Sequence, residues 1–330
     1  MDAKNGLEAF TAIRNLVDEG AEREAFDTAV AEQYNHAAET AGPVAVANQV
    51  QTPETPFEAK SKTFLDPEAT MSVTEQLDTM NEFWGELNWS MPVLSEENEQ
   101  HLQTVLEANP GKRVVPTPLV DPYERVAIAE DAKAAFPKNE FTANGKALWT
   151  PDESWTYGKL LRSPESVVQE DRKKYALGYK TPDGVVTTRS DYIESLIEAG
   201  QAVKQGELVW TFPVTDVSVQ SERTYTTASK LHEATDPVET PESLIVTQLL
   251  HQANGTPNPN WAVDFANEAV YEVKEAGKGS DKHIEFGAVV LVASVCWNPD
   301  YRQVNSNTWN PQYQDDSFGR RDAASGISKA

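Results

Sequence analysis

An apolar run near the C-terminus constrains the fold of this chain more than any other feature. Residues 287–297 contain no charged side chain, and residues 284–297 together are typical of a strand. The run is far too short to cross a bilayer, so it predicts a strand buried inside a globular protein. Asn298-Pro299-Asp300 then forms a turn signal, and residues 301–309 lead the chain back. This pattern predicts an antiparallel meander around one fully buried strand.

Helix-start signals alternate with strand-like runs along the rest of the body. In each signal a proline follows Ser, Thr or Asp and precedes an acidic residue within the first turn, which suits the helix dipole. The strand-like runs cover residues 113–120, 175–188 and 208–214. The signals are Asp121-Pro122-Tyr123-Glu124, Thr150-Pro151-Asp152-Glu153, Ser163-Pro164-Glu165 and Thr240-Pro241-Glu242.

These patterns predict an α+β protein, with a helical acidic N-terminal region followed by a mixed α/β body with an antiparallel C-terminal sheet. We expect residues 1–40 to form an amphipathic helical arm, because apolar residues recur at helical spacing over residues 7–39. Residues 41–70 are a Pro/Thr-rich linker, and residues 71–112 are an acidic helical segment. Residues 113–320 form the body, and residues 321–330 are a loose tail.

The charge of the chain is strongly negative and unevenly distributed. The net charge is −24, and residues 1–112 hold 21 of the 52 acidic residues but only 6 of the 28 basic ones. Such a field repels nucleic acid and anionic lipid, so we expect neither as a partner. A signal peptide and a membrane-spanning stretch are not visible, which predicts a soluble, cytoplasmic protein.

Residues that could carry chemistry are few. The chain shows no phosphate-binding glycine loop, and its five histidines lack the spacing of paired zinc ligands, so we expect no cofactor and no metal. Its single cysteine, Cys296, excludes an intramolecular disulfide. We interpret Cys296 as a small buried hydrophobe rather than a nucleophile, because His283 lies thirteen residues away along the same strand.

Asp264 and Glu268 are the strongest candidates for paired catalytic carboxylates. The segment around them, residues 263–273, fits a strand and fits a helix nearly as well, and the two carboxylates share a face in both cases. Two carboxylates near aromatic rings are typical of glycoside hydrolases. The competing interpretation is that both are solvated acids of an acidic protein. His251 is a third candidate, and we favour a solvated or helix-capping cation at the end of its helix.

The stretch after the apolar run is rich in aromatic and amide side chains. Rings supply rigid contact area and amides supply hydrogen bonds, a combination suited to binding a carbohydrate or a protein. The alternative is a hairpin whose rings pack on the core, and the nearby Arg320-Arg321 pair could bind an acid within the chain or across subunits. The candidate binding residues are Trp297, Asn298, Tyr301, Trp309 and Tyr313.

Our leading functional hypothesis is a non-enzymatic interaction or assembly protein whose N-terminal helices dock on a protein partner, including a second copy of the chain. The reasons are the detached amphipathic arm, the linker and the lack of a recognised catalytic motif. The alternative is a hydrolase or carbohydrate-active protein that uses Asp264 and Glu268 with the aromatic stretch of residues 297–313. A third hypothesis, mimicry of DNA, is disfavoured because the acids are scattered around the predicted helices rather than arrayed on one face.

Overall fold

The computed structural model describes residues 56–135, 142–143, 146–147, 156–159, 163–218, 222–253, 263–278, 282–298, 303–321 and 323–328. The predicted helical arm and the Thr150-Pro151 helix start lie outside these ranges. The chain divides into a unit of residues Met1–Pro53 and a unit of residues Glu54–Ala330, and all that follows concerns the second unit. This unit has a mixed α+β fold, so the predicted fold class is confirmed.

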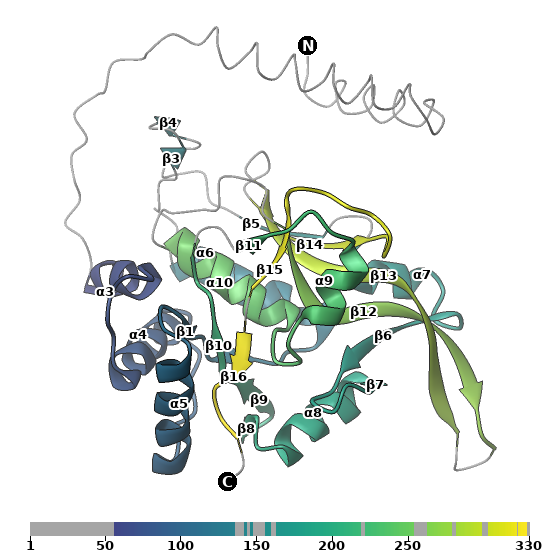
Figure 1. Cartoon of the computed structure of the whole chain (residues 1–330), viewed down its shortest axis with the longest axis horizontal. Coiled ribbons are helices and arrows are strands. Elements are labelled where there is room, and N and C mark those ends of the chain that lie inside the picture. Colours follow the sequence, from purple (N-terminus) through teal and green to yellow (C-terminus); the bar gives the residue numbers. More distant parts are fainter. Residues whose placement is uncertain are drawn as a thin grey trace, which may run out of the picture. The chain divides into compact units, whose positions relative to one another are not determined.

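Helices and strands of the described chain alternate through most of its length (Figure 1). The helices are α3 (Pro56–Leu65), α4 (Val73–Glu86), α5 (Glu96–Ala108), the 3-10 helix η1 (Pro122–Glu124), α6 (Val126–Ala135), α7 (Pro164–Glu170), α8 (Arg189–Glu198), α9 (Ala228–Ala234) and α10 (Pro241–Ala253). The strands are β1 (Arg113–Val114), β2 (Thr117–Pro118), β3 (Thr142–Ala143), β4 (Lys146–Ala147), β5 (Thr156–Lys159), β6 (Tyr175–Lys180), β7 (Val186–Thr187), β8 (Ala202–Gln205), β9 (Leu208–Thr211), β10 (Pro213–Thr215), β11 (Glu222–Arg223), β12 (Val263–Ala276), β13 (His283–Asn298), β14 (Gln303–Trp309), β15 (Phe318–Arg320) and β16 (Ala323–Ser325).

The largest sheet is built on the C-terminal meander. Its strand order is β11-β15-β12-β13-β14-β5, and β6 pairs with β12 and β7 beside this path. Strands β12, β13 and β14 pair antiparallel in sequence order, which confirms the predicted meander. The segment of residues 263–273 is therefore a strand rather than a helix. Two smaller three-stranded sheets have the orders β1-β10-β16 and β2-β9-β8.

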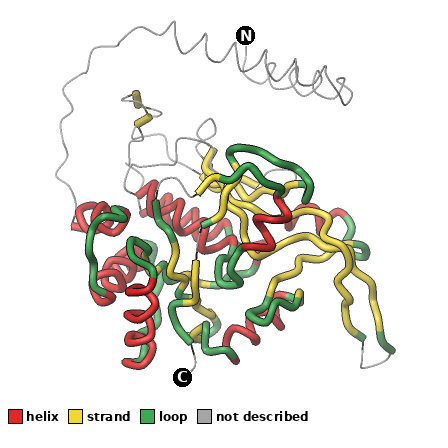
Figure 2. The backbone as a smooth tube through the Cα atoms, in the orientation of Figure 1, coloured by secondary structure: helices red, strands yellow, loops and turns green. Residues whose placement is uncertain are grey.

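Helices pack on both faces of the meander (Figure 2). On one face α10 joins the main hydrophobic core, which includes Ala266 of β12 and Val295 of β13. On the other face α9 packs against Phe265 of β12 and Cys296 of β13 in a second core. Side chains alternate between the two faces of a strand, so neighbouring residues of β12 and β13 enter different cores. Because α10 also contacts α3 and α6, it is buried at every described position.

A bulge interrupts β12 in the middle of its buried half. Phe265 lies opposite Ser294 and Ala269 lies opposite Val292, so β12 has two extra residues relative to β13 between these two pairs. The other edge of β12 changes partner here, from β15 at Asp264 to β6 at Glu268. Bulges redirect side chains and often lie next to functional sites. Because the bulge adds two residues, side-chain alternation continues across it, and Asp264 and Glu268 both lie on the α10 side of the sheet.

Two segments that were predicted to lack regular structure are part of the fold. Helix α3 lies within the predicted linker and places Phe64 in the core with 0% exposure. The Arg113 guanidinium donates hydrogen bonds to the Phe64 and Ala69 carbonyl oxygens, each at 2.8 Å. In the predicted loose tail, β16 pairs with β10 and Ile327 is fully buried. Contacts with distant strands order these polar segments, and local composition does not reveal such contacts.

The strand that was predicted to be fully buried is buried only in its second half, from Val292 to Cys296. Residues Val292 to Cys296 of β13 are buried, where β12 and β14 flank the strand on both sides. Residues 283–291 are exposed or half-buried, because the pairing with β14 begins at Val292. The prediction was wrong here because hydrophobic content identifies a strand but not the length over which neighbours cover it.

None of the described helices is long and apolar enough to cross a membrane.

Candidate functional site

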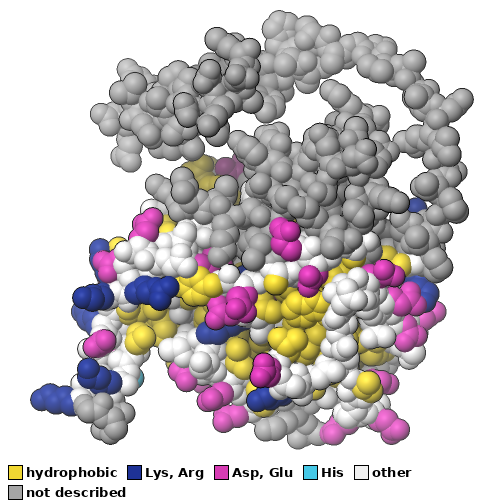
Figure 3. Space-filling view, turned by 180° about the vertical axis from the view of Figure 1, so that it is seen from behind, with side chains coloured by type: hydrophobic (Ala, Val, Ile, Leu, Met, Phe, Trp, Pro, Cys, Tyr) yellow, Lys and Arg dark blue, Asp and Glu magenta, His cyan; other side chains and the backbone are white. Residues whose placement is uncertain are grey.

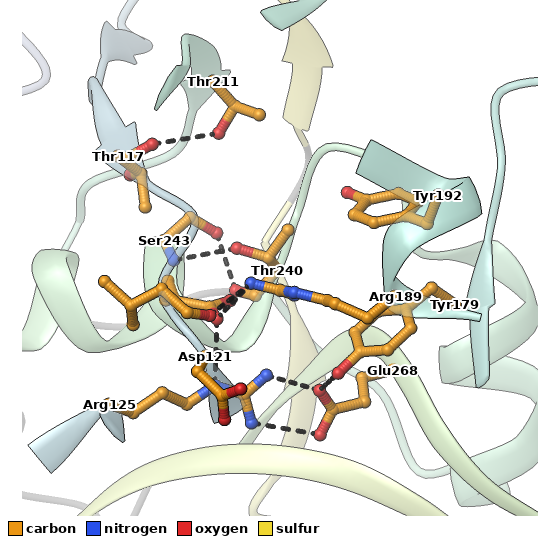
Figure 4. A network of polar contacts seen from close by, with 12 residues as sticks. Thr117, Asp121, Arg125, Tyr179, Arg189, Tyr192, Thr211, Thr240, Ser243 and Glu268 are labelled. Atoms are coloured by element: carbon orange, nitrogen blue, oxygen red, sulfur yellow. Dashed lines mark hydrogen bonds and ion pairs between the residues drawn. The ribbon is translucent and has the colours of Figure 1, made fainter. Parts of the chain in front are cut away.

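A fully buried arginine stands at the centre of the most polar part of the core. Arg125 follows η1, the short helix that Asp121 caps and Pro122 begins. Its side chain has 0% exposure, and its guanidinium reaches carboxylates from three different elements. These carboxylates are Glu165 of α7 at 3.0 Å, Glu242 of α10 at 3.0 Å, and Glu268 of β12. Two guanidinium nitrogens of Arg125 donate to Glu268 (Figure 4).

Three of the helix-start signals meet at this arginine. Glu165 follows Pro164 in the first turn of α7, and Glu242 follows Pro241 in the first turn of α10. From the sequence we interpreted these acids as favourable charges at helix N-termini, which is only part of their role. Their recurrence was the one sequence signal that could have led to the buried cluster. The partner arginine carried no signal of its own, since residue 125 lies 117 positions from Glu242.

A second arginine and a tyrosine extend the network. Arg189, the first residue of α8, donates to a Glu242 oxygen at 2.7 Å and to the Val120 carbonyl oxygen at 2.7 Å. Its guanidinium lies 5.0 Å from the centre of the Tyr179 ring, and the Tyr179 hydroxyl donates to Glu268 at 2.5 Å. We call this set the Arg125 cluster, defined as Arg125, Glu165, Tyr179, Arg189, Glu242 and Glu268.

Mutual attraction keeps Arg125 and Glu242 ionised despite burial. Burial alone would lower the pKa of Arg125, but Glu242 and Glu268 raise it well above its usual value. Burial would raise the pKa of Glu242, but Arg125 and Arg189 hold it below its usual value. Burial and the negative charge of Glu268 raise the pKa of Tyr179, so its hydroxyl remains a donor. Such a cluster ties helices and sheet together, and losing one partner leaves uncompensated buried charge.

A second arginine cluster lies further along the same side of β12. Arg321 is fully buried and donates to Asp264 at 3.0 Å and to the Asp216 and Ser218 carbonyl oxygens at 2.6 and 3.0 Å. Of the two roles suggested for Arg320-Arg321, the intrachain pair is the one seen, and Arg320 donates to the Ala234 carbonyl oxygen at 3.0 Å. Arg321 therefore connects the bulged strand to the segment that follows β10.

His251 is buried beside Arg321 rather than solvated. Its Nε2 atom lies 2.8 Å from the Val217 carbonyl oxygen, and the side chain has 0% exposure. Burial, reinforced by the positive charge of Arg321, lowers the pKa of His251 to about 3. The imidazole is neutral at neutral pH, so Nε2 donates its proton to Val217. The expectation of a solvated or helix-capping cation was wrong, because the end of α10 is covered by other parts of the fold.

Replacing His251 with glutamine is expected to reduce the loss of stability in acid. The pKa of His251 in the folded state lies below its unfolded value near 6.5, so a proton binds the unfolded chain preferentially. The protein therefore loses stability as the pH falls below about 6.5 towards 3. At pH 5 His251 lowers the free energy of unfolding by about 2 kcal/mol. His251→Gln keeps an N–H donor for the Val217 carbonyl oxygen but does not titrate. Urea unfolding at pH 5 and pH 7.5 measures the difference. His283→Gln, at an exposed site, is the control, and equal acid sensitivity in both variants would contradict the assignment.

The two candidate carboxylates do not form a pair. Asp264 and Glu268 both have 0% exposure, and they bind different arginines, Arg321 and Arg125. The interpretation that both are solvated acids was wrong, because both lie on the side of β12 that α10 covers. Their geometry suits charge neutralisation inside the fold. A role in acid–base chemistry requires contact with a substrate, which neither carboxylate can make without opening of the core.

The aromatic stretch is described in part. Trp309 and Tyr313 stack with ring centres 5.5 Å apart, and both contact the buried Phe318 edge-on. The Trp309 indole also donates to the Ser294 hydroxyl at 3.0 Å, while Tyr313 is 44% exposed. Trp297 and Asn298 end β13, but their side chains and all of Tyr301 lie outside the described part. This geometry resembles a hairpin with its rings on the core.

Cys296 lies in the second core, as predicted for a small buried hydrophobe. Burial, with a contribution from the Asp264 charge, raises the pKa of its thiol to about 12, which disfavours the thiolate.

Within the described ranges, no group of three or more His, Cys, Asp or Glu side chains is placed to hold a metal ion. Comparisons with protein-family models, with curated proteins and with solved structures find no match for the chain.

Proposed function

We propose that the chain is a non-enzymatic interaction or assembly protein that binds a protein partner through the ribbon formed by β12 and β13. One observation supports this proposal most strongly. The first half of β13, residues 283–291, is mostly apolar in sequence but lies outside the fully covered part of the sheet. Ile284 is exposed, and the other large apolar side chains of this segment are half-buried. An apolar strand segment that its own fold leaves partly uncovered is typical of a surface that a partner covers.

The exposed segment also has an open edge. One edge of β13 pairs with β12 from Ala276 to Val263, but β14 covers the other edge only from Val292 onward. Among the described strands, none pairs with this outer edge over residues 283–291. An open edge presents backbone donors and acceptors that can pair with a strand of another chain. The ribbon projects from the body, with basic side chains near its end (Figures 1 and 3).

The predicted N-terminal helices would supply a second contact with the partner. Their apolar stripe, residues 7–17, needs a surface to cover it, and the division of the chain at Pro53 separates this segment from the body. We propose a second copy of the chain as the partner, in the cytoplasm. The hydrolase alternative is not favoured by a specific observation, since Asp264 and Glu268 each bind an arginine inside the core.

Charged substitutions on the ribbon are expected to weaken self-association. We predict that Ile284→Lys and Val290→Lys each raise the dissociation constant about tenfold or more, because a charge would be buried at the interface. Ile284 is 43% exposed, so the fold of the monomer tolerates the change. Sedimentation equilibrium of the intact chain measures the constant.

Val93→Lys is the matched control for these substitutions. Val93 is 91% exposed, lies outside the ribbon, and should leave association unchanged. A dissociation constant that does not respond to either ribbon substitution would contradict the proposed surface. An intact chain that stays monomeric at every concentration would contradict self-association itself.

A further inference from the structure

A further buried carboxyl group lies between α10 and strand β10, apart from the four buried carboxylates that bind arginine. Glu239 precedes α10 and has 0% exposure. Its Oε1 atom lies 2.5 Å from the Ser243 hydroxyl oxygen, and its Oε2 atom accepts from the Thr215 hydroxyl at 2.9 Å. Its backbone is fixed as well, since its carbonyl oxygen accepts from the Asn267 amide in the bulge of β12 at 2.9 Å. Glu239 thus connects β10, α10 and β12.

Hydrogen bonds offer little compensation for a negative charge on Glu239. The Ser243 hydroxyl oxygen lies 2.8 Å from the Thr240 carbonyl oxygen and 2.5 Å from the Glu239 carboxyl oxygen, and both of these oxygens accept from it. A hydroxyl group has one proton to donate, so Ser243 shares it between two acceptors. Thr215 is the other hydroxyl that donates to Glu239. Because a buried carboxylate costs far more than a buried neutral acid, this environment favours the neutral carboxylic acid.

The surrounding charges favour the same state. Arg321, directly after β15, is the arginine whose positive charge acts on Glu239, but its Nε atom donates a hydrogen bond to Asp264 of β12. Asp264 is a like charge that opposes a second negative charge beside it. His251 of α10 is neutral, and Asp216, after β10, holds its carboxylate on the Ser218 amide and hydroxyl. Ionised Glu239 would therefore add a second carboxylate to a group of charges with one arginine.

We infer that Glu239 is a proton-binding site built into the fold, and that release of its proton weakens the packing of α10 against the two sheets. The site makes the body sensitive to pH near neutrality. This role is independent of the ribbon and of the proposed self-association.

The direction of the pH effect follows from the environment of Glu239. Burial raises the pKa of Glu239 to about 7, although its hydrogen bonds with Ser243 and Thr215 and the charge of Arg321 act in the opposite direction. The folded state thus binds the proton more tightly than the unfolded chain, whose value is 4.5. Stability from this group is present in full below pH 4.5 and is lost as pH rises through about 7. The loss corresponds to a few-hundred-fold change in the unfolding equilibrium constant.

The test compares the intact chain with Glu239→Gln by urea unfolding between pH 4 and pH 9. The amide mimics the neutral acid, because it has nearly the same shape, keeps an oxygen that can accept from Ser243, and carries no charge. We expect the variant to gain stability relative to the wild type as pH rises from 4.5 to about 7, and the gain to stay constant above that. The difference between the two chains cancels the opposite titration of His251. Glu233→Gln, at an exposed position of α9, should give no such pH-dependent gain.

Infrared spectroscopy of the wild-type chain gives a second measurement that does not depend on the variant. At pH 6, solvated carboxyl groups are ionised, so a carboxylic-acid carbonyl band that disappears above pH 8 reports a buried neutral acid. We expect this band in the wild type and its loss in Glu239→Gln. Absence of the band at pH 6, or a stability difference that is flat across pH, would overturn the inference.

Discussion

Replacing Arg125 with methionine is expected to cost the protein about 4 kcal/mol or more of unfolding free energy at pH 7. The substitution keeps the volume of the side chain but leaves three buried glutamates, from α7, α10 and β12, without their shared cation. Arg189 still contacts Glu242, but it does not reach the other two carboxylates. Chemical denaturation followed by circular dichroism measures the loss.

The origin of this loss can be tested through pH and a matched control. Protonation neutralises the orphaned glutamates, so the deficit of Arg125→Met relative to the wild type should shrink as the pH falls. Arg172→Met removes an exposed guanidinium that lies 5.8 Å from the Tyr123 ring, and it should cost less than about 1 kcal/mol. A loss for Arg125→Met as small as that of the control would show that the cluster does not hold these elements together.

Two N-terminal truncations are expected to behave very differently. Removal of residues 1–53 should leave a folded body, because the second unit begins at Glu54 and has its own core. Removal of residues 1–70 should unfold it, because this deletes α3 with Phe57 and Phe64 and the carbonyl groups that bind Arg113. Losing two buried phenylalanines alone costs about 6 kcal/mol or more, comparable to the total stability of a typical domain.

Thermal unfolding and sedimentation of both truncated chains test this contrast. The shorter truncation should melt cooperatively near the temperature of the intact chain and should self-associate more weakly, since the predicted helical contact is gone. The longer truncation should show no cooperative transition. A cooperative melt of the chain without residues 1–70, at the temperature of the intact chain, would contradict the role assigned to α3.

The sequence predicted the elements of the fold better than their environment. Hydrophobic patterning identified the meander of β12, β13 and β14, and the Ser163-Pro164-Glu165 signal marked the start of α7. Patterning failed where long-range contacts decide the outcome. Arg113 fixes α3 through backbone carbonyls nearly fifty residues away, and β10 pairs with β16 near the end of the chain. Such contacts leave no periodic signal in either segment.

The candidate site was predicted in part. Asp264 and Glu268 were identified as notable carboxylates, but their arginine partners were not, because Arg125 and Arg321 are distant in sequence from both. The bulge that separates the two carboxylates depends on backbone pairing with β13 and on the change of partner from β15 to β6. Residue spacing alone cannot reveal this geometry.

Hydrogen exchange of the β13 edge tests the proposed assembly most directly. Backbone amides of residues 283–291 that point away from β12 have no strand partner among the described residues, so they should exchange rapidly in dilute solution. If a second copy adds a strand to this edge, these amides become protected as the concentration rises, while Val290→Lys prevents the protection. Exchange of residues 283–291 that is equally fast at low and high concentration would contradict the account.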